Sequence, residues 1–194
     1  MQKAVQKLAL LTLSGTLAYS QTATPPAATP ASRPTAATYI TKDDVDAVLK
    51  SQPLGDHDIK SVDVGKLNLS VGVVSRAASK PSADGSVNVL AHHHQTETYI
   101  IIEGSGTLVT GGDTYDGRET PPTSMMYTTY NGPTTQGKTK NGVRRVVNVG
   151  DIVIIPPDVN HGWAEIPVHV TYLSVRPDPD RQLPAGYVFP ALRK

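Results

Sequence analysis

Three consecutive histidines stand at positions 92–94, in the stretch AHHHQTETYIIIEG, and they are half of the six histidines in the chain. Because side chains alternate along a β-strand, His92 and His94 are expected on one face and His93 on the other. Two imidazoles spaced in this way can both reach one metal ion, at about 2.0–2.1 Å. Glu97 opens the apolar run that follows and can bring a carboxylate to the same point. The stretch alone leaves two interpretations open: a metal site, or a solvated polar turn before a strand.

A second stretch, GDIVIIPPDVNH at residues 150–161, adds a fourth candidate ligand. It reads as a turn, an apolar strand, a sharp proline turn and then His161, so this histidine is expected on a rigid element. Three neutral imidazoles and one carboxylate suit a divalent transition metal such as Fe, Mn, Ni, Cu or Zn, and they leave coordination positions for water or substrate. With both stretches counted, the metal site is the favoured interpretation.

The segments that must position these residues are mostly short strands. Alternation of period two is clear at residues 67–73, and similar runs follow at residues 87–94, 97–103, 106–110, 143–149, 152–155 and 168–176. One helix is predicted, with Thr41 as its cap, Asp44 three residues later and Pro53 just beyond its end. Short strands with tight turns between them predict an all-β sandwich or barrel with a short N-terminal helix.

The segment at residues 114–141 interrupts this pattern. It is rich in Thr, Gly and Pro, and it also carries Met125, Met126 and Tyr127. A structureless loop of this length in a compact domain usually has a function or is disordered. Three interpretations stay open: a surface loop without a role, a lid, or an oligomer contact.

The first 38 residues are predicted to lie outside the folded domain. Two lysines precede an apolar run at residues 8–17, and Ala18 and Ser20 are the small residues before a cleavage point, which is the layout of a secretory signal at residues 1–20. The apolar run is too short to cross ~30 Å of hydrocarbon, and a buried N-terminal helix is the alternative. Residues 21–38 are mostly Pro, Ala and Thr and predict a disordered linker. The barrel domain would then span residues 39–194, with residues 114–141 as an inserted loop.

Charge and cysteine content narrow the function classes. Cleavage after Ser20 removes two of the 18 basic residues and none of the 17 acidic ones, so the mature chain carries a net charge of −1. No basic patch then argues for nucleic acid as a partner. The chain has no cysteine, which excludes disulfides, a thiol nucleophile and a thiolate metal site. Export predicts a periplasmic or secreted protein with no membrane span after signal cleavage.

The two histidine-containing stretches resemble the two motifs of the cupin superfamily. The first motif is matched by glycines at both ends, two histidines and a glutamate: Gly85, His92, His94, Glu97 and Gly104. The second is matched by Gly150, Pro156 and His161. The first motif is irregular, because only two residues separate His94 from Glu97 and six separate Gly85 from His92. This irregularity leaves the register open, with His93 as an alternative ligand to His92 or His94.

The resemblance covers about residues 67–176 and implies a double-stranded β-helix barrel of the jelly-roll kind. It implies that His92, His94, Glu97 and His161 hold one divalent metal ion inside the barrel. The expected function is a metal-dependent oxidoreductase, similar to a dioxygenase, that acts on a small organic molecule, with Glu97 also able to leave the metal and act as a base. The alternative is a non-catalytic module that binds a sugar or metabolite, with the metal as a clamp. Homodimers are common among proteins of this kind.

Overall fold

The computed structural model describes residues 34–193. The predicted signal peptide at residues 1–20 and residues 21–33 of the predicted linker lie outside this range. Residues 34–41 form neither helix nor strand, and nearly all of them are exposed. Among the described residues, no helix is both long and apolar enough to span a membrane.

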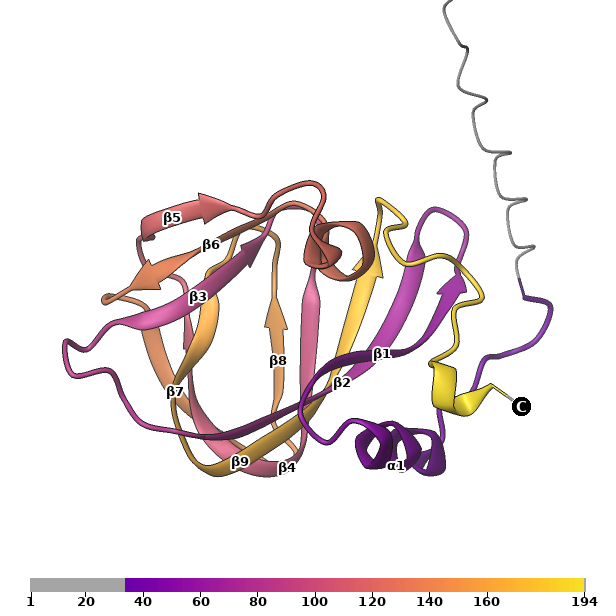
Figure 1. Ribbon diagram of the computed structural model, residues 1–194, viewed down its shortest axis with the longest axis horizontal. Helices are drawn as coiled ribbons and strands as arrows, with labels where there is room; N and C mark the ends of the chain where they lie inside the picture. Colours follow the sequence, from indigo (N-terminus) through magenta and orange to yellow (C-terminus); the bar gives the residue numbers. More distant parts are fainter. Residues whose placement is uncertain (1–33, 194) are drawn as a thin grey trace, which may run out of the picture.

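The described part of the chain forms two antiparallel layers that curve around a common interior (Figure 1). Its strands are β1 (Gly55–Asp63), β2 (Asn68–Ser79), β3 (Val87–His92), β4 (Glu97–Thr110), β5 (Tyr115–Glu119), β6 (Thr134–Thr139), β7 (Val143–Asn148), β8 (Ile152–Ile155) and β9 (His161–Asp178). One layer has the order β1–β2–β9–β4–β8. The other contains β5, β6, β3 and β7, and the ends of β9 and β4 complete it.

The long strands β4 and β9 close the barrel because each belongs to both layers. The first part of β4 pairs with β8 and β9, whereas its last six residues pair with β7. Register shifts between Ile101 and Glu103 and between Gly104 and Thr107 bend β4. At Gly104 the backbone has φ +69°, and a Cβ atom there would lie 2.0 Å from the carbonyl oxygen of His169. Only glycine fits this bend, which explains the closing glycine of the first motif.

The interior is filled mainly by branched and aromatic side chains. Its main cluster consists of Val74, Tyr99, Ile101, Leu108, Val147, Ile155, Ile166, Val170 and Tyr172, all buried between the two layers. Such burial of apolar surface is the main favourable contribution to folding, and it has to suffice in a chain without disulfides. The packed interior also fixes the strand ends on which the candidate ligands lie.

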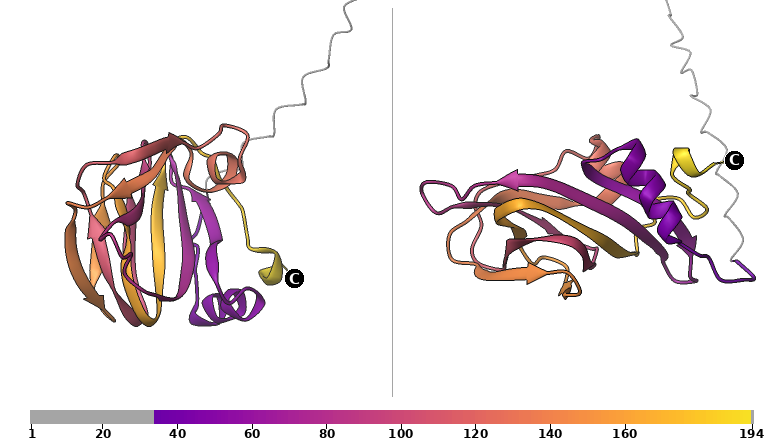
Figure 2. Two further views of the ribbon diagram at one scale, coloured as in Figure 1. Left: turned by 60° about the vertical axis from the view of Figure 1, so that its left-hand side comes forward. Right: turned by 90° about the horizontal axis from the view of Figure 1, so that it is seen from below.

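Helix α1 (Lys42–Ser51) covers the outer face of the sheet near β1 and β2, as Figure 2 shows. Thr41 caps it: its hydroxyl accepts a hydrogen bond from the Asp44 backbone, and the Asp44 carboxylate accepts one from the Thr41 backbone. Val45 and Val48 are buried against Ile59 of β1, together with the C-terminal turn η2 (Pro190–Leu192). The predicted all-β fold with a short N-terminal helix is therefore confirmed.

The segment at residues 114–141 differs from the expected loop. It contains β5, the π-helical turn η1 (Met126–Asn131) and β6. All six residues of β6 pair with β3, so much of the segment is part of the barrel wall. The reason is that Thr-rich sequence with interspersed glycine is compatible with a strand when a partner strand supplies the hydrogen bonds. Two further differences concern strands. The sequence pattern did not predict β1, and β9 begins at His161 rather than at residue 168.

Candidate metal centre

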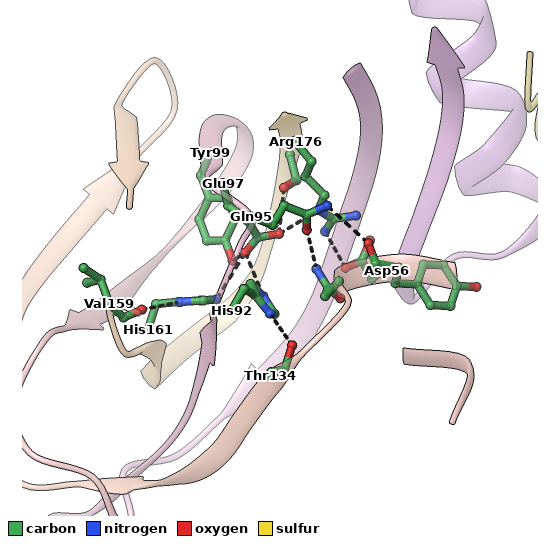
Figure 3. A network of polar contacts seen from close by, with 12 residues as sticks. Asp56, His92, Gln95, Glu97, Tyr99, Thr134, Val159, His161 and Arg176 are labelled. Carbon is green, nitrogen blue, oxygen red and sulfur yellow. Dashed lines mark hydrogen bonds and ion pairs between the residues drawn. The ribbon is translucent and has the colours of Figure 1, made fainter. Parts of the chain in front are cut away.

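Three candidate ligands meet inside the barrel at the ends of three strands. His92 is the last residue of β3, Glu97 the first of β4 and His161 the first of β9. Leu90 of β3 pairs with His161, which places the two histidine-bearing strands side by side. The three residues are 2–4 % exposed, and their ligand atoms lie within 4.8 Å of one another (Figure 3).

The tautomer of His92 is fixed by Thr134 of β6. His92 Nδ1 lies 2.8 Å from the Thr134 hydroxyl oxygen, and that hydroxyl already donates to the carbonyl of Gly132 at 3.0 Å. The hydroxyl can therefore only accept from His92, so Nδ1 carries the hydrogen. The lone pair of Nε2 then faces the site. Burial lowers the pKa of His92, although Glu97 opposes this effect, and the imidazole is kept neutral.

The tautomer of His161 is fixed by the backbone. Its Nδ1 lies 3.0 Å from the carbonyl oxygen of Val159, which can only accept a hydrogen bond. Nδ1 therefore carries the hydrogen, and Nε2 presents a lone pair. This nitrogen is buried and has no hydrogen-bond partner among the described residues.

The two lone pairs converge on one carboxylate oxygen. Glu97 Oε2 lies 3.5 Å from His92 Nε2 and 3.1 Å from His161 Nε2. Three electron-pair donors facing one another in a buried place repel unless a cation lies among them. Two imidazoles with fixed tautomers and one carboxylate are a ligand set that divalent transition metals prefer. These residues thus fit a metal ion, and the orphaned Nε2 of His161 is the clearest sign of it.

The second oxygen of Glu97 is held on the opposite side by β9. Glu97 Oε1 accepts hydrogen bonds from Arg176 Nε at 2.6 Å and from the Ser174 hydroxyl at 3.1 Å. Oε2 also accepts a hydrogen bond from the Tyr99 hydroxyl at 2.8 Å. Burial alone would raise the pKa of Glu97, but the charge of Arg176 opposes this effect, and the pKa lies well below its ordinary value. Glu97 is therefore ionised and turns only Oε2 toward the histidines.

Arg176 anchors this arrangement from a completely buried position. Besides Glu97 it contacts two carboxylates of β1, Asp56 at 2.5 Å and Asp58 at 3.4 Å. Burial raises the pKa of Asp58 to about 6, although Arg176 opposes the rise. Sequence analysis did not identify Arg176 as a site residue. The sequence pattern that could have indicated its role is the alternation of polar residues Ser174, Arg176 and Asp178 along one strand. The structure shows that all three are buried.

The structure places His94 and His93 away from this group, in contrast to the expected pairing of His92 with His94. The His94 side chain is 53 % exposed, and its Nδ1 lies 2.5 Å from Asp180. His93 lies between the carboxylates of Asp158 and Glu119, at 2.6 and 3.1 Å. The physical reason is that β3 ends at His92, so the alternation of period two does not continue through the next two residues.

A cavity of about 930 Å³ opens on the three candidate ligands. Its wall includes Tyr99, Tyr172 and Trp163, which lie in a row. The ring centroids of Tyr99 and Tyr172 are 4.2 Å apart, and those of Tyr172 and Trp163 are 5.7 Å apart. Asn131 of η1 also lines the cavity and donates a hydrogen bond to buried Gln95. The site is thus large enough for a small organic molecule.

Comparisons with known proteins give only distant similarities. No protein-family model matches the sequence, and no curated protein matches it. A solved structure of the protein BH2720 from Bacillus halodurans is 13% identical, with a TM-score of 0.47 over 82% of this chain and 93% of that one. An RmlC-like cupin with a double-stranded β-helix fold from Methanocaldococcus jannaschii is 12% identical, with a TM-score of 0.36 over 63% of this chain and 82% of that one.

A third similar structure is the DMSP lyase DddQ from Ruegeria pomeroyi DSS-3, which is 14% identical with a TM-score of 0.35. The similarity covers 58% of this chain and only 39% of that one.

In this chain, β4 and β9 join the two layers of strands, and the two histidine-containing motifs lie at neighbouring strand ends. With this strand arrangement and this placement of its motifs, the chain has the double-stranded β-helix barrel fold of the cupin superfamily.

Proposed function

We propose that the protein is a metal-dependent oxidoreductase, similar to a dioxygenase, that acts on a small organic molecule. The observation that carries the proposal is the convergence of three buried electron-pair donors, His92 Nε2, His161 Nε2 and Glu97 Oε2. Two histidines and one carboxylate with open positions are typical of non-haem Fe(II) oxygenases. When bound, the metal would supply coordination positions at which substrate and O₂ can meet.

The chain's own groups prepare this site for a metal. Thr134 and the carbonyl of Val159 orient the two imidazoles, and Arg176 keeps Glu97 ionised. Burial raises the pKa of Tyr99 well above its ordinary value, and the nearby Glu97 adds to this rise. Its hydroxyl therefore stays protonated and donates to Glu97 Oε2 at the wall of the cavity.

A catalytic-base role for Glu97 stays a prediction and is the less favoured of its two roles. A carboxylate whose pKa is held well below its ordinary value accepts a proton poorly. Its Oε1 is also occupied by Arg176 and Ser174. The contacts of Glu97 support a role as a metal ligand with one oxygen toward the ion.

Export remains part of the proposal, on the signal-like pattern of residues 1–20. A chain that acquires its metal outside the cytoplasm meets a competition in which affinity follows the order Mn, Fe, Co, Ni, Cu, with Zn below Cu. The quantity to measure is therefore the identity of the metal that the protein carries when it is isolated from its natural compartment. Isolation from the cytoplasm of the producing cell would contradict export.

The test is the metal content of the purified protein and of two histidine variants. His161→Ala should lose about one equivalent of a transition metal that the unmodified protein contains. His94→Ala is the matched control, because it removes an imidazole that lies outside the site, and it should keep the metal. O₂ consumption with a panel of phenols, thiols and diketones then separates the two function classes. Full metal content without turnover across the panel would favour the non-catalytic binding module.

A further inference from the structure

The guanidinium of Arg76 lies in the wall of the cavity and forms no ion pair with the described residues. Arg76 of β2 lies at the exposed rim, and its Nε donates a hydrogen bond to the hydroxyl of buried Tyr172 at 3.2 Å. No ion pair involves Arg76 among the described residues. The nearby carboxylate of Asp56 is paired with Arg176 instead. The guanidinium is thus held in place by one nitrogen and keeps its other donors for a ligand.

The other charges of the cavity add to this positive character. Arg118 of β5 and Lys138 of β6 line the cavity from the opposite layer of strands, and neither forms an ion pair with an acidic residue among residues 34–193. Glu119 is engaged by His93 and Thr135. Asp116 is then the single acidic residue of the described lining without an ion-pair partner. The outer part of the cavity therefore favours an anion.

The aromatic row connects this cationic rim with the candidate metal ligands. The Tyr99 hydroxyl donates to Glu97 at one end, and the Tyr172 hydroxyl accepts from Arg76 at the other. The centroids of the two rings are 4.2 Å apart and their planes are tilted by 39°, and Trp163 lies beside Tyr172. Tyr99 and Tyr172 are 4 % and 1 % exposed, so half-buried Trp163 is the ring of this row that offers surface to a flat apolar ligand, next to the hydroxyl that Arg76 contacts.

We infer that the substrate is an aromatic carboxylate, bound by Arg76 through its carboxylate and by Trp163 through its ring. Arg76 is then the residue that determines specificity for an anion. The inference rests on the proposed function for its reaction, but the binding site itself consists of groups that do not ligate the metal. A guanidinium matches a carboxylate with two parallel hydrogen bonds, which a neutral amide cannot reproduce.

The test uses benzoate and its neutral counterpart benzamide as probes. Trp163 is the one tryptophan of the chain and lies in the cavity wall, so its fluorescence reports binding without any turnover. Dissociation constants are measured on metal-loaded protein and on protein freed of metal by a chelator. Because a carboxylate can also bind a metal directly, the metal-free measurement isolates the contribution of Arg76.

Benzoate should bind at least about 10-fold more tightly than benzamide in both preparations, as expected for a charge-assisted hydrogen bond. Arg76→Gln should remove most of this preference while keeping the metal content, and Arg76→Lys should restore part of it. Lys140→Gln is the matched control, because it removes one positive charge outside the cavity, where Lys140 pairs with Asp84, and it should keep the preference.

Equal binding of the two probes by the unmodified protein, or a preference that survives in Arg76→Gln, would overturn the inference. Its failure is distinguishable from that of the proposed function. A protein that binds no metal but prefers benzoate through Arg76 refutes the metal-dependent function alone. A metal-binding protein without the preference refutes the anion site alone.

Discussion

The substitution Asp58→Asn tests the charge balance of the buried cluster around Arg176. The Asp58 side chain is 1 % exposed, and its Oδ2 has no hydrogen-bond partner among the described residues. Burial raises its pKa from the ordinary 3.8 to about 6, against the attraction of Arg176 at 3.4 Å. At 1.36 kcal/mol per pKa unit, this rise corresponds to about 3 kcal/mol of free energy.

The direction of the pH effect follows from which state holds the proton more tightly. Since the folded pKa lies above the unfolded one, the folded protein binds more protons between these values. The contribution of Asp58 to the free energy of unfolding is therefore fully present below about pH 3.8 and is lost as the pH rises through about 6. Asparagine imitates the protonated, neutral side chain and keeps this contribution at every pH.

We expect Asp58→Asn to be more stable than the unmodified protein by about 2–3 kcal/mol at pH 8, and this advantage should shrink toward zero near pH 4. The measurement is urea unfolding of both proteins at several pH values in the presence of a chelator, so that metal binding does not contribute. Ser51→Ala, at the exposed end of α1, changes no ionisable group and is the control whose effect should not change with pH.

A difference between Asp58→Asn and the unmodified protein that stays constant from pH 4 to pH 8 would refute this reasoning. A constant loss of stability would mean that Asp58 is ionised throughout and that its attraction to Arg176 exceeds the cost of burial. The cluster would then be an ordinary buried ion network rather than one in which Asp58 takes up a proton as the pH falls through about 6.

Three further substitutions test other parts of the structure. Arg176→Met should lower the free energy of unfolding, measured with urea, by about 3–5 kcal/mol, because it leaves buried carboxylates without their counter-charge. A loss below about 1 kcal/mol would mean that Arg176 does not stabilise these carboxylates. Thr134→Val should weaken metal binding, measured by titration calorimetry, by roughly 10–100-fold, because His92 Nδ1 loses its hydrogen-bond partner. An unchanged affinity would mean that Thr134 does not hold the tautomer of His92. Gly104→Ala should lower the melting temperature clearly more than Gly85→Ala. Both substitutions cost about 1–2 kcal/mol because the backbone is left-handed, but only at position 104 does the new Cβ meet His169. Equal melting temperatures would contradict the tight bend at Gly104.

The parts of the structure that depend on local pattern could be predicted from the sequence. The cap at Thr41 and the apolar face of α1 involve residues a few positions apart, and the turns and strand runs around the two motifs are equally local. His92, Glu97 and His161 were identified from such patterns, and the structure brings them together.

The remaining features depend on where strands end and which strands meet. The position of His94 depended on whether β3 continues for two more residues, which its partner β6 decides and the sequence alone does not show. Strand β6 mixes Thr, which favours strands, with Gly and Lys, which do not, and β3 stabilises it by pairing. Arg176 acquires its role from carboxylates far away in the chain, so no local pattern could assign it.

From the contacts of the cluster around Arg176 we also expect a particular order of events when the chain folds. Arg176 joins Glu97 and Asp56, residues that are 79 and 120 positions away from it along the chain. Contacts of such long range form slowly, because the entropy of closing large loops is lost before the contacts are made. Glu97 reaches its final orientation only when β9 has joined both β2 and β4. Tight metal capture should therefore coincide with the last phase of refolding, so the rate at which the protein acquires metal would report how fast the barrel closes.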